Sequence, residues 1–142
     1  MAHVLSQDIV KEAHSWLGVK WRHQGRSKMG VDCAGLVYCV GVNVGINLQD
    51  YTGYPNSPNV TFLKYFDQNG YKIGMRDLAP GDLVVFSDQR HPCHCGIMVQ
   101  DRRIIHAHIS FRRVIIQPLK DAVKWSGKVK HVFRYPNANG AK

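Results

Sequence analysis

The 142-residue sequence lacks any long hydrophobic run. No apolar stretch reaches the roughly 18 residues that a membrane-spanning helix needs, so no transmembrane segment is expected. The first residues, "MAHVLSQDIVKEAHSWLG", also lack the charged-then-apolar pattern of a secretory signal. We therefore expect synthesis in the cytoplasm without a signal peptide. In that compartment the four cysteines are expected to be thiols rather than disulfides.

Acidic residues are scarce: 10 Asp and Glu stand against 19 Lys and Arg, which gives a net charge of +9. Such an excess favours an anionic polymer as partner, whether nucleic acid, a membrane surface or bacterial wall material. The basic residues are scattered, and no predicted strand carries the aromatic-and-basic pattern of an RNA-binding sheet. Charge alone does not choose among these partners, although the missing pattern argues against nucleic acid.

Internal repeats, low-complexity tracts and linkers are absent as well, so we expect one domain over residues 1–142. Helical patterns come first. "SQDIVKEAHSWLG" has Ser6 as its expected N-cap and Gly18 as its stop. Its apolar stripe comprises Ile9, Val10, Ala13, Trp16 and Leu17. "DCAGLVYCVGVNVG" predicts a second helix capped by Asp32, and a short third helix is expected over Val60–Asp67.

From "LAPGDLVVF" onward the pattern changes to strands. We expect strands at Leu83–Phe86, His94–Gln100, Arg103–Ile109, Val114–Gln117 and Lys130–Arg134, with a short helix at Leu119–Lys124. The second and third of these strands are separated only by Asp101-Arg102, which predicts a hairpin. Helices followed by an antiparallel sheet predict the α+β class.

The stretch "HPCHCGIMV", residues 91–99, concentrates histidine and cysteine. A structural zinc site needs a second ligand pair at a workable spacing, and none follows here. In a strand, Cys93 and Cys95 share one face and His94 lies on the other, so one metal ion would not easily collect all three. We therefore predict no metal and no cofactor, and we expect Cys95 to be a small buried apolar side chain.

His94 has a candidate partner on the next predicted strand. In "RRIIHAHIS", His106 and His108 share one face, and the hairpin brings the neighbourhood of His106 beside that of His94. Two imidazoles within hydrogen-bonding distance allow one ring to orient and polarise the other. Histidine pairs on sheets are more often structural, so this pair alone does not establish a catalytic site.

Cys33 supplies a third element. "GVDCAGLV" places this cysteine at the first turn of a helix, directly after Asp32, where free N–H groups and the helix dipole stabilise a thiolate. Cys39 lies among valines and fits a buried structural position better. A cysteine nucleophile at a helix N-terminus, a histidine base (His94) and a polar orienting residue (His106) together make a papain-like thiol site.

At these residues the sequence resembles the NlpC/P60 cysteine peptidases. "GVDCAGLVY" is similar to the family's DCSGLV nucleophile motif, and "LAPGDLVVF" is similar to its LxPGDLVxF strand. "HCGIMVQDRRIIHA" is similar to its HVGIYxG…HA hairpin, with the two histidines twelve positions apart. The resemblance covers most of the chain. Within the family, "KWRHQGRSKMGVDCAGLV" most resembles the short, signal-less peptidases encoded among bacteriophage tail genes.

The resemblance implies a papain-like NlpC/P60 fold, with the cysteine helix packed on a central antiparallel sheet. It also implies hydrolysis of a peptide bond in peptidoglycan stem peptides, typically between γ-D-glutamate and the following diamino acid. In that reading Cys33 is the nucleophile, His94 the general base and acid, and His106 the orienting residue. The basic surface fits an anionic wall, and the missing signal fits delivery by a virion tail, with phage tail proteins as partners.

Two positions depart from the family pattern. Trp21 stands where the family usually has a tyrosine that helps the oxyanion site, so stabilisation there leans more on the Cys33 backbone N–H. Ala34 replaces a serine that often follows the nucleophile, which leaves the preferred stem peptide open. The remaining candidates for oxyanion or substrate contact are Asp32, His23, His91 and His108.

Two other functional classes stay open. One is a thiol amidase, acyltransferase or transglutaminase-like enzyme on the same scaffold, because the motifs do not specify the acyl acceptor. The other is a non-catalytic wall-binding or tail module that kept the fold. The complete Cys-His-His set argues against the second class.

Overall fold

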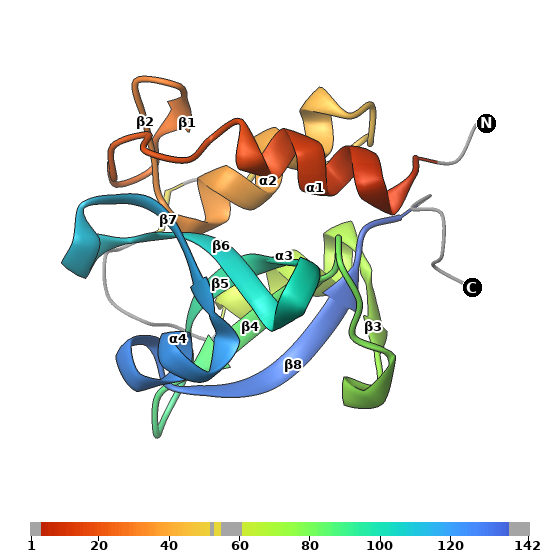
Figure 1. Cartoon of the computed structure of the whole chain (residues 1–142), viewed down its shortest axis with the longest axis vertical. Helices are drawn as coiled ribbons and strands as arrows, with labels where there is room; N and C mark the ends of the chain where they lie inside the picture. Colours follow the sequence, from red (N-terminus) through yellow and green to blue (C-terminus); the bar gives the residue numbers. More distant parts are fainter. Residues whose placement is uncertain (1–3, 52, 55–60, 137–142) are drawn as a thin grey trace.

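The computed structural model describes residues 4–51, 53–54 and 61–136, which form helices packed on an antiparallel sheet (Figure 1). The four α-helices are α1 (Ser6–His14), α2 (Cys33–Asn43), α3 (Thr61–Asn69) and α4 (Leu119–Ser126). Three short 3-10 helices are η1 (Met75–Asp77), η2 (Gln100–Arg102) and η3 (Ile109–Phe111).

The main sheet has six strands in the order β3-β8-β4-β5-β6-β7, and every neighbouring pair is antiparallel. Its strands are β3 (Tyr71–Ile73), β4 (Leu83–Ser87), β5 (Pro92–Val99), β6 (Arg103–His108), β7 (Arg113–Pro118) and β8 (Lys128–Arg134). A separate small hairpin joins β1 (Arg26–Ser27) to β2 (Gly30–Val31), immediately before α2.

Each face of the main sheet has its own apolar layer. Side chains of α1, α2 and α3 pack on one face, where Ile9, Leu36 and Phe66 meet inward-facing strand residues. On the other face, Leu119 and Ala122 of α4 pack on strand residues such as Phe86. Figure 1 shows α1 and α2 on one side of the sheet and α4 on the opposite side. The sheet is therefore buried on both faces, and its functional side chains lie where these layers end.

These elements confirm the predicted α+β class, the five predicted strands and the helix after Pro118. The third predicted helix is α3, which is described from Thr61 and ends at Asn69; its first predicted residue, Val60, lies outside the described residues. The short strands β1, β2 and β3 were not predicted, because two or three residues are too few to show alternation.

The N-terminal helix differs from the prediction at both ends. Ser6 is its first helical residue rather than its cap; Leu5 holds the cap position without a side-chain hydrogen bond. The helix ends at His14, and the chain turns through Gly18, whose φ is +86°. Leu17 is 38% exposed although it was predicted in the buried stripe, because the helical period no longer applies beyond the end of the helix.

The start of α2 confirms the predicted cap. The Asp32 carboxylate accepts a hydrogen bond from the Gly35 backbone N–H at 2.8 Å, so the helix begins at Cys33. The β1–β2 hairpin approaches this turn closely. A Cβ at Gly35 would lie 2.2 Å from the carbonyl oxygen of Gly25, so only glycine fits there. The cap and this close approach together fix the position of Cys33.

The predicted hairpin between β5 and β6 is also confirmed. Its turn has three residues rather than two: Gln100–Arg102 (η2) connects Val99 to its strand partner Arg103, so β5 ends one residue before the predicted Gln100. Asp101 and Arg102 have φ values of 63° and 53°. Cys95 is fully buried as predicted, but Cys93, predicted on the same strand face, is not part of that apolar layer. The pairing between β4 and β5 shifts register here, and the Cys93 thiol donates a hydrogen bond to the Ser126 carbonyl at 3.3 Å.

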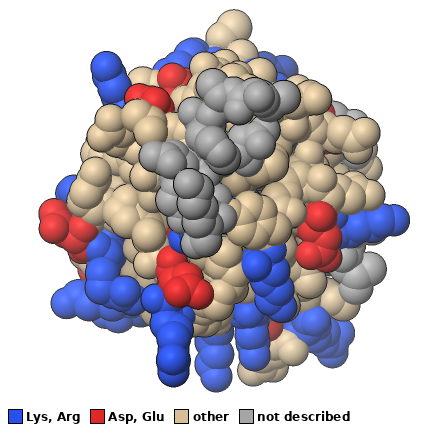
Figure 2. Space-filling model, turned by 90° about the vertical axis from the view of Figure 1, so that its right-hand side faces the viewer, with Lys and Arg blue, Asp and Glu red and all other residues tan. Residues whose placement is uncertain are grey.

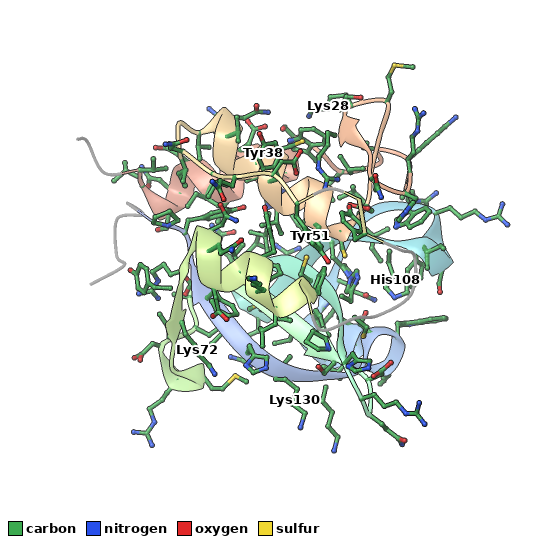
Figure 3. The ribbon with its side chains drawn as sticks, turned by 180° about the vertical axis from the view of Figure 1, so that it is seen from behind. Lys28, Tyr38, Tyr51, Lys72, His108 and Lys130 are labelled. Atoms are coloured by element: carbon green, nitrogen blue, oxygen red, sulfur yellow. The ribbon has the colours of Figure 1, made fainter. Side chains whose placement is uncertain are left out.

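Positive charge gathers along one edge of the surface. Figure 2 shows Lys and Arg side chains concentrated along the lower edge of the face that carries β3 and β8. Lys72 of β3 and Lys130 of β8, both exposed and labelled in Figure 3, project from that edge, at a distance from His108. None of the helices in the described parts of the chain is long and apolar enough to cross a bilayer.

Candidate active site

Cys33 opens into a cavity of about 320 Å³ at the N-terminal end of α2. The cavity is lined by side chains from segments that are distant in the sequence. They include Trp21, His23, Asp32, Cys33, Tyr51, Tyr54, Cys93, His94, His108, Trp125 and Ser126. The structure thus brings the predicted nucleophile and the predicted base, His94, to the same hollow.

Behind the cavity, three side chains form a continuous hydrogen-bonded chain. His94 Nε2 lies 2.6 Å from His106 Nδ1, and His106 Nε2 lies 2.8 Å from Oε1 of Gln117. His106 is completely buried, and His94 is buried beside the ring of Phe86, with a centroid distance of 5.5 Å. The predicted histidine pair is present, and Gln117 extends it by one residue.

Strand pairing explains why these side chains meet. A Cβ at Gly96 of β5 would lie 2.9 Å from the Cβ of His106 on the neighbouring strand β6. A glycine at this position therefore makes room for the histidine. On the other side of β6, Ile104 pairs with Gln117 and His106 pairs with Ile115. Gln117 therefore lies diagonally across from His106 on the same face, within reach of its ring.

Burial keeps both rings of the histidine pair neutral. It is the main reason that the pKa of His94 lies well below its ordinary value, with smaller contributions from His106 and His108. Burial likewise lowers the pKa of His106 to about 4, against a smaller raising effect of the Gln117 hydrogen bond. At neutral pH each ring carries one proton, and each has one nitrogen free to accept another.

Cys33 and His94 line the same cavity without a hydrogen bond between them. Because Nε2 of His94 faces His106, Nδ1 is the nitrogen left for exchange with a thiol. The backbone N–H groups of Cys33 and Ala34 have no partner among the described residues, as is usual in the first turn of a helix. These groups offer donors to an oxyanion beside the sulfur.

His108, which was predicted to share a strand face with His106, is hydrogen-bonded elsewhere. Its Nδ1 accepts a hydrogen bond from the Ser110 backbone N–H at 3.0 Å. Its ring centroid is 4.9 Å from that of His94, but no hydrogen bond joins the two rings. The structure thus pairs His94 with His106 and leaves His108 in the cavity wall.

The Asp32 carboxylate, predicted near the substrate, lies in a dense hydrogen-bond network. Besides capping α2, it accepts from the Gln24 backbone N–H at 2.7 Å, from Arg26 Nη1 at 3.2 Å and from the Tyr54 hydroxyl. Arg26 Nη2 also donates to the Tyr54 hydroxyl at 3.0 Å. The carboxylate therefore holds the loops around Cys33 in place.

The other predicted contact residues differ in their positions. Trp21 lines the cavity, and its indole N–H donates to no described residue. His23 lines it too, with its ring edge-on to Tyr54 at 5.4 Å. His91 does not line the cavity: its backbone N–H is held by the Asp88 carboxylate at 2.8 Å, in the turn before β5.

Several cavity residues were missed from the sequence. Tyr51 and Tyr54 stack at 4.5 Å and form an aromatic wall; Tyr51 and His108 are labelled in Figure 3. Trp125 packs against the ring of Phe111 in η3, directly after β6, and remains 56% exposed at the rim of the cavity. Ser126 lines the cavity with a buried hydroxyl that has no hydrogen-bond partner among the residues that the structure describes. No local sequence pattern marks these residues, because only the fold brings them together.

The remaining cysteines fit structural roles. All four cysteines are thiols. Cys95 is fully buried, and burial raises the pKa of its thiol well above the ordinary value, with a further contribution from the neighbouring Cys33. Among the described residues, no group of three or more His, Cys, Asp or Glu side chains is arranged to hold a metal ion.

Comparison with known proteins agrees with this geometry. A family profile described as NlpC/P60 matches residues 18–134. The gamma-DL-glutamyl hydrolase of Bacillus subtilis (strain 168) is 32% identical over 135 residues, covering 89% of this chain and 29% of that protein. The murein DD-endopeptidase MepS/murein LD-carboxypeptidase of Escherichia coli (strain K12) is 28% identical over 103 residues, covering 72% of this chain and 49% of that protein.

The chain therefore spans half or less of the length of these two relatives. Among solved structures, an NlpC/P60 family protein from Bacillus cereus ATCC 10987 superposes with a TM-score of 0.74 at 22% identity, covering 92% of this chain and 40% of that one. The matched region runs from before the β1–β2 hairpin to the end of β8, and so contains the whole cysteine–histidine arrangement. On this evidence the chain belongs to the NlpC/P60 family.

Proposed function

We propose that this chain is a cysteine peptidase that hydrolyses peptidoglycan stem peptides. One observation carries the proposal: Cys33, at a helix N-terminus with free N–H groups, shares a cavity with a buried neutral His94 whose Nδ1 is available. A thiol, a neutral base and an oxyanion donor are the parts that acyl transfer from an amide requires. The printed names of the two relatives, a glutamyl hydrolase and a murein endopeptidase, support this substrate class.

The reaction follows from the positions of these groups. His94 Nδ1 takes the thiol proton of Cys33, and the sulfur adds to the scissile carbonyl carbon, forming the C–S bond. The carbonyl electron pair moves to oxygen, where the Cys33 backbone N–H stabilises the negative charge. When the tetrahedral intermediate collapses, the C–N bond breaks and His94 gives its proton to the leaving amine. Water, deprotonated by His94, then cleaves the thioester and releases the acid and the free thiol.

His106 does not exchange protons with substrate in this scheme. Its Nδ1 accepts from His94 Nε2–H, which holds the base in position and stabilises the imidazolium that forms transiently. The cavity wall of Trp21, His23 and His108 supplies substrate contacts.

Finer features of the proposal rest on the family resemblance of the motifs. We infer that the bond cleaved joins γ-D-glutamate to the following diamino acid, and that the enzyme acts from a bacteriophage tail or a related particle. The basic edge at Lys72 and Lys130 supports an anionic wall as the larger target.

Digestion of purified sacculi, followed by mass spectrometry of the released fragments, tests the proposal. We expect new free amines on the diamino acid and terminal γ-D-glutamate, with no products from Cys33→Ala. Adding an amine acceptor separates hydrolysis from acyl transfer, because only transfer yields amide adducts. Binding to sacculi without any released fragment would instead indicate a non-catalytic wall-binding module.

A further inference from the structure

Gln117 lies outside the cavity and touches no reacting atom, yet it ends the hydrogen-bonded chain that reaches the base. Its Oε1 lies 2.8 Å from His106 Nε2, and His106 Nδ1 lies 2.6 Å from His94 Nε2. The three side chains come from the neighbouring strands β7, β6 and β5. No other described residue is hydrogen-bonded to the His106 ring, so Gln117 is the outermost partner in the chain.

The amide oxygen of Gln117 determines which nitrogen donates in each hydrogen bond of this series. With Oε1 of Gln117 toward the ring, the amide accepts the hydrogen bond, and His106 Nε2 then carries the proton of that ring. The neutral ring then has a bare Nδ1, which accepts from His94 Nε2–H. His94, neutral as well, is left with a lone pair on Nδ1, the nitrogen that remains for the Cys33 thiol.

The opposite tautomer would disable the base. If His106 carried its proton on Nδ1, it would donate to His94 Nε2, and the single proton of the His94 ring would lie on Nδ1. A protonated Nδ1 cannot take a proton from a thiol. Only one of the two tautomers of His106 is therefore compatible with general-base action by His94, and the Gln117 oxygen favours that one.

We propose that Gln117 is a positioning residue that fixes the tautomers of His106 and His94, so that Nδ1 of His94 is kept free for the nucleophile. The consequence for turnover rests on the proposed peptidase function, whereas the tautomers are properties of the protein alone. Gln117 belongs to strand β7 and pairs directly with Ile104 of β6. It therefore lies diagonally across from His106.

Nitrogen-detected NMR of histidine-labelled protein reads these tautomers directly. In the wild type we expect both His106 and His94 to carry the proton on Nε2. Gln117→Leu removes the acceptor, so His106 should populate both tautomers, and kcat should fall about 10- to 100-fold with KM little changed. Gln100→Leu, which changes an exposed glutamine in the β5–β6 turn, should leave the tautomers and kcat unchanged.

Gln117→Glu provides the rescue. A carboxylate oxygen also accepts from Nε2–H, so this variant should recover the wild-type tautomer and most of kcat. Its negative charge should raise the pKa of His106 and move the acid limb of kcat/KM to higher pH. Recovery of both the tautomer and kcat is the result that a purely structural role of Gln117 would not give.

Finding Nδ1–H on His106 in the wild type would overturn the proposal, as would unchanged tautomers and kcat in folded Gln117→Leu. If the tautomers behave as expected but the wild type cleaves no stem peptide, the positioning of the rings stands and the proposed peptidase activity fails.

Discussion

Mild acid should destabilise this protein through its buried histidines, and His106 shows how large the effect is. In the folded state burial lowers the pKa of this fully buried ring to about 4, against an ordinary value of 6.5. The unfolded chain therefore binds a proton at a higher pH than the folded chain does. The stability that His106 contributes is fully present above pH 6.5 and is lost as the pH falls from there towards 4.

The size of the loss follows from that interval. At about 1.4 kcal/mol per pH unit, the gap between 6.5 and about 4 corresponds to about 3 kcal/mol for His106 alone. Burial lowers the pKa of His94 and of His108 as well, so these rings act in the same direction. The free energy of unfolding of a domain is only about 5–15 kcal/mol in total, so a large part of the stability of this protein should depend on pH.

Urea unfolding followed by tryptophan fluorescence, at pH values from about 8 to 4, measures this effect. As the pH falls, the free energy of unfolding of the wild type should decrease faster than that of His106→Gln. The difference between the two free energies should change by about 3 kcal/mol from about pH 8 to pH 4. His14→Gln, which makes the same change at an exposed histidine of α1, is the matched control. Parallel curves for the wild type and His106→Gln, within about 0.5 kcal/mol, would show that His106 is not a buried neutral ring.

Three further outcomes are expected. His106→Ala should lower kcat/KM more than His108→Ala, because only His106 is bonded to His94, and the reverse order in folded variants would reassign the orienting role. Cys93→Ser and Cys95→Ala should cost at most about 1 kcal/mol of stability, and chelators should change neither activity nor Tm; stoichiometric zinc in protein purified without added metal would reverse this expectation. Rising salt should reduce activity on sacculi more than on a soluble stem peptide, because screening acts over about 10 Å at 0.1 M; equal sensitivity would remove the role of surface charge.

Features governed by local rules were predictable from the sequence. The Asp32 cap and the hairpin turn at Asp101-Arg102 each depend on a few adjacent residues; the cap is present as predicted, and the turn is present with Gln100 as a third residue. Together they fix the start of α2 and the pairing of β5 with β6. The pairing of His94 with His106 follows from the hairpin, whereas Cys33 meets them only because α2 packs on β5.

Features that depend on contacts between distant segments were not predictable. The N-terminal helix stops early because the following chain joins the sheet edge: Gly18 N–H donates to the Val114 carbonyl at 3.0 Å, and Val114 N–H donates to the Val19 carbonyl at 2.8 Å. Gln117 was missed because the β6–β7 register depends on η3 and on Arg112, whose φ of 60° is unusual for a residue other than glycine.

The network around Asp32 could not be anticipated either. Its partner Tyr54 lies 22 residues away, outside the described helices and strands, and only the fold brings the hydroxyl to the carboxylate. Asp32 therefore resembled a substrate contact in the sequence, whereas its oxygens are already occupied by groups of the protein.

The decisive measurement for Cys33 is rapid-quench mass spectrometry during turnover of a defined stem peptide. If Cys33 is the nucleophile, a thioester adduct with the mass of the γ-D-glutamyl fragment should appear on the peptide that contains Cys33, and His94→Ala should slow its formation severely. Turnover that persists in Cys33→Ala, or an adduct located on Cys93 or Cys95 instead, would show that the sulfur at the start of α2 does not carry the reaction.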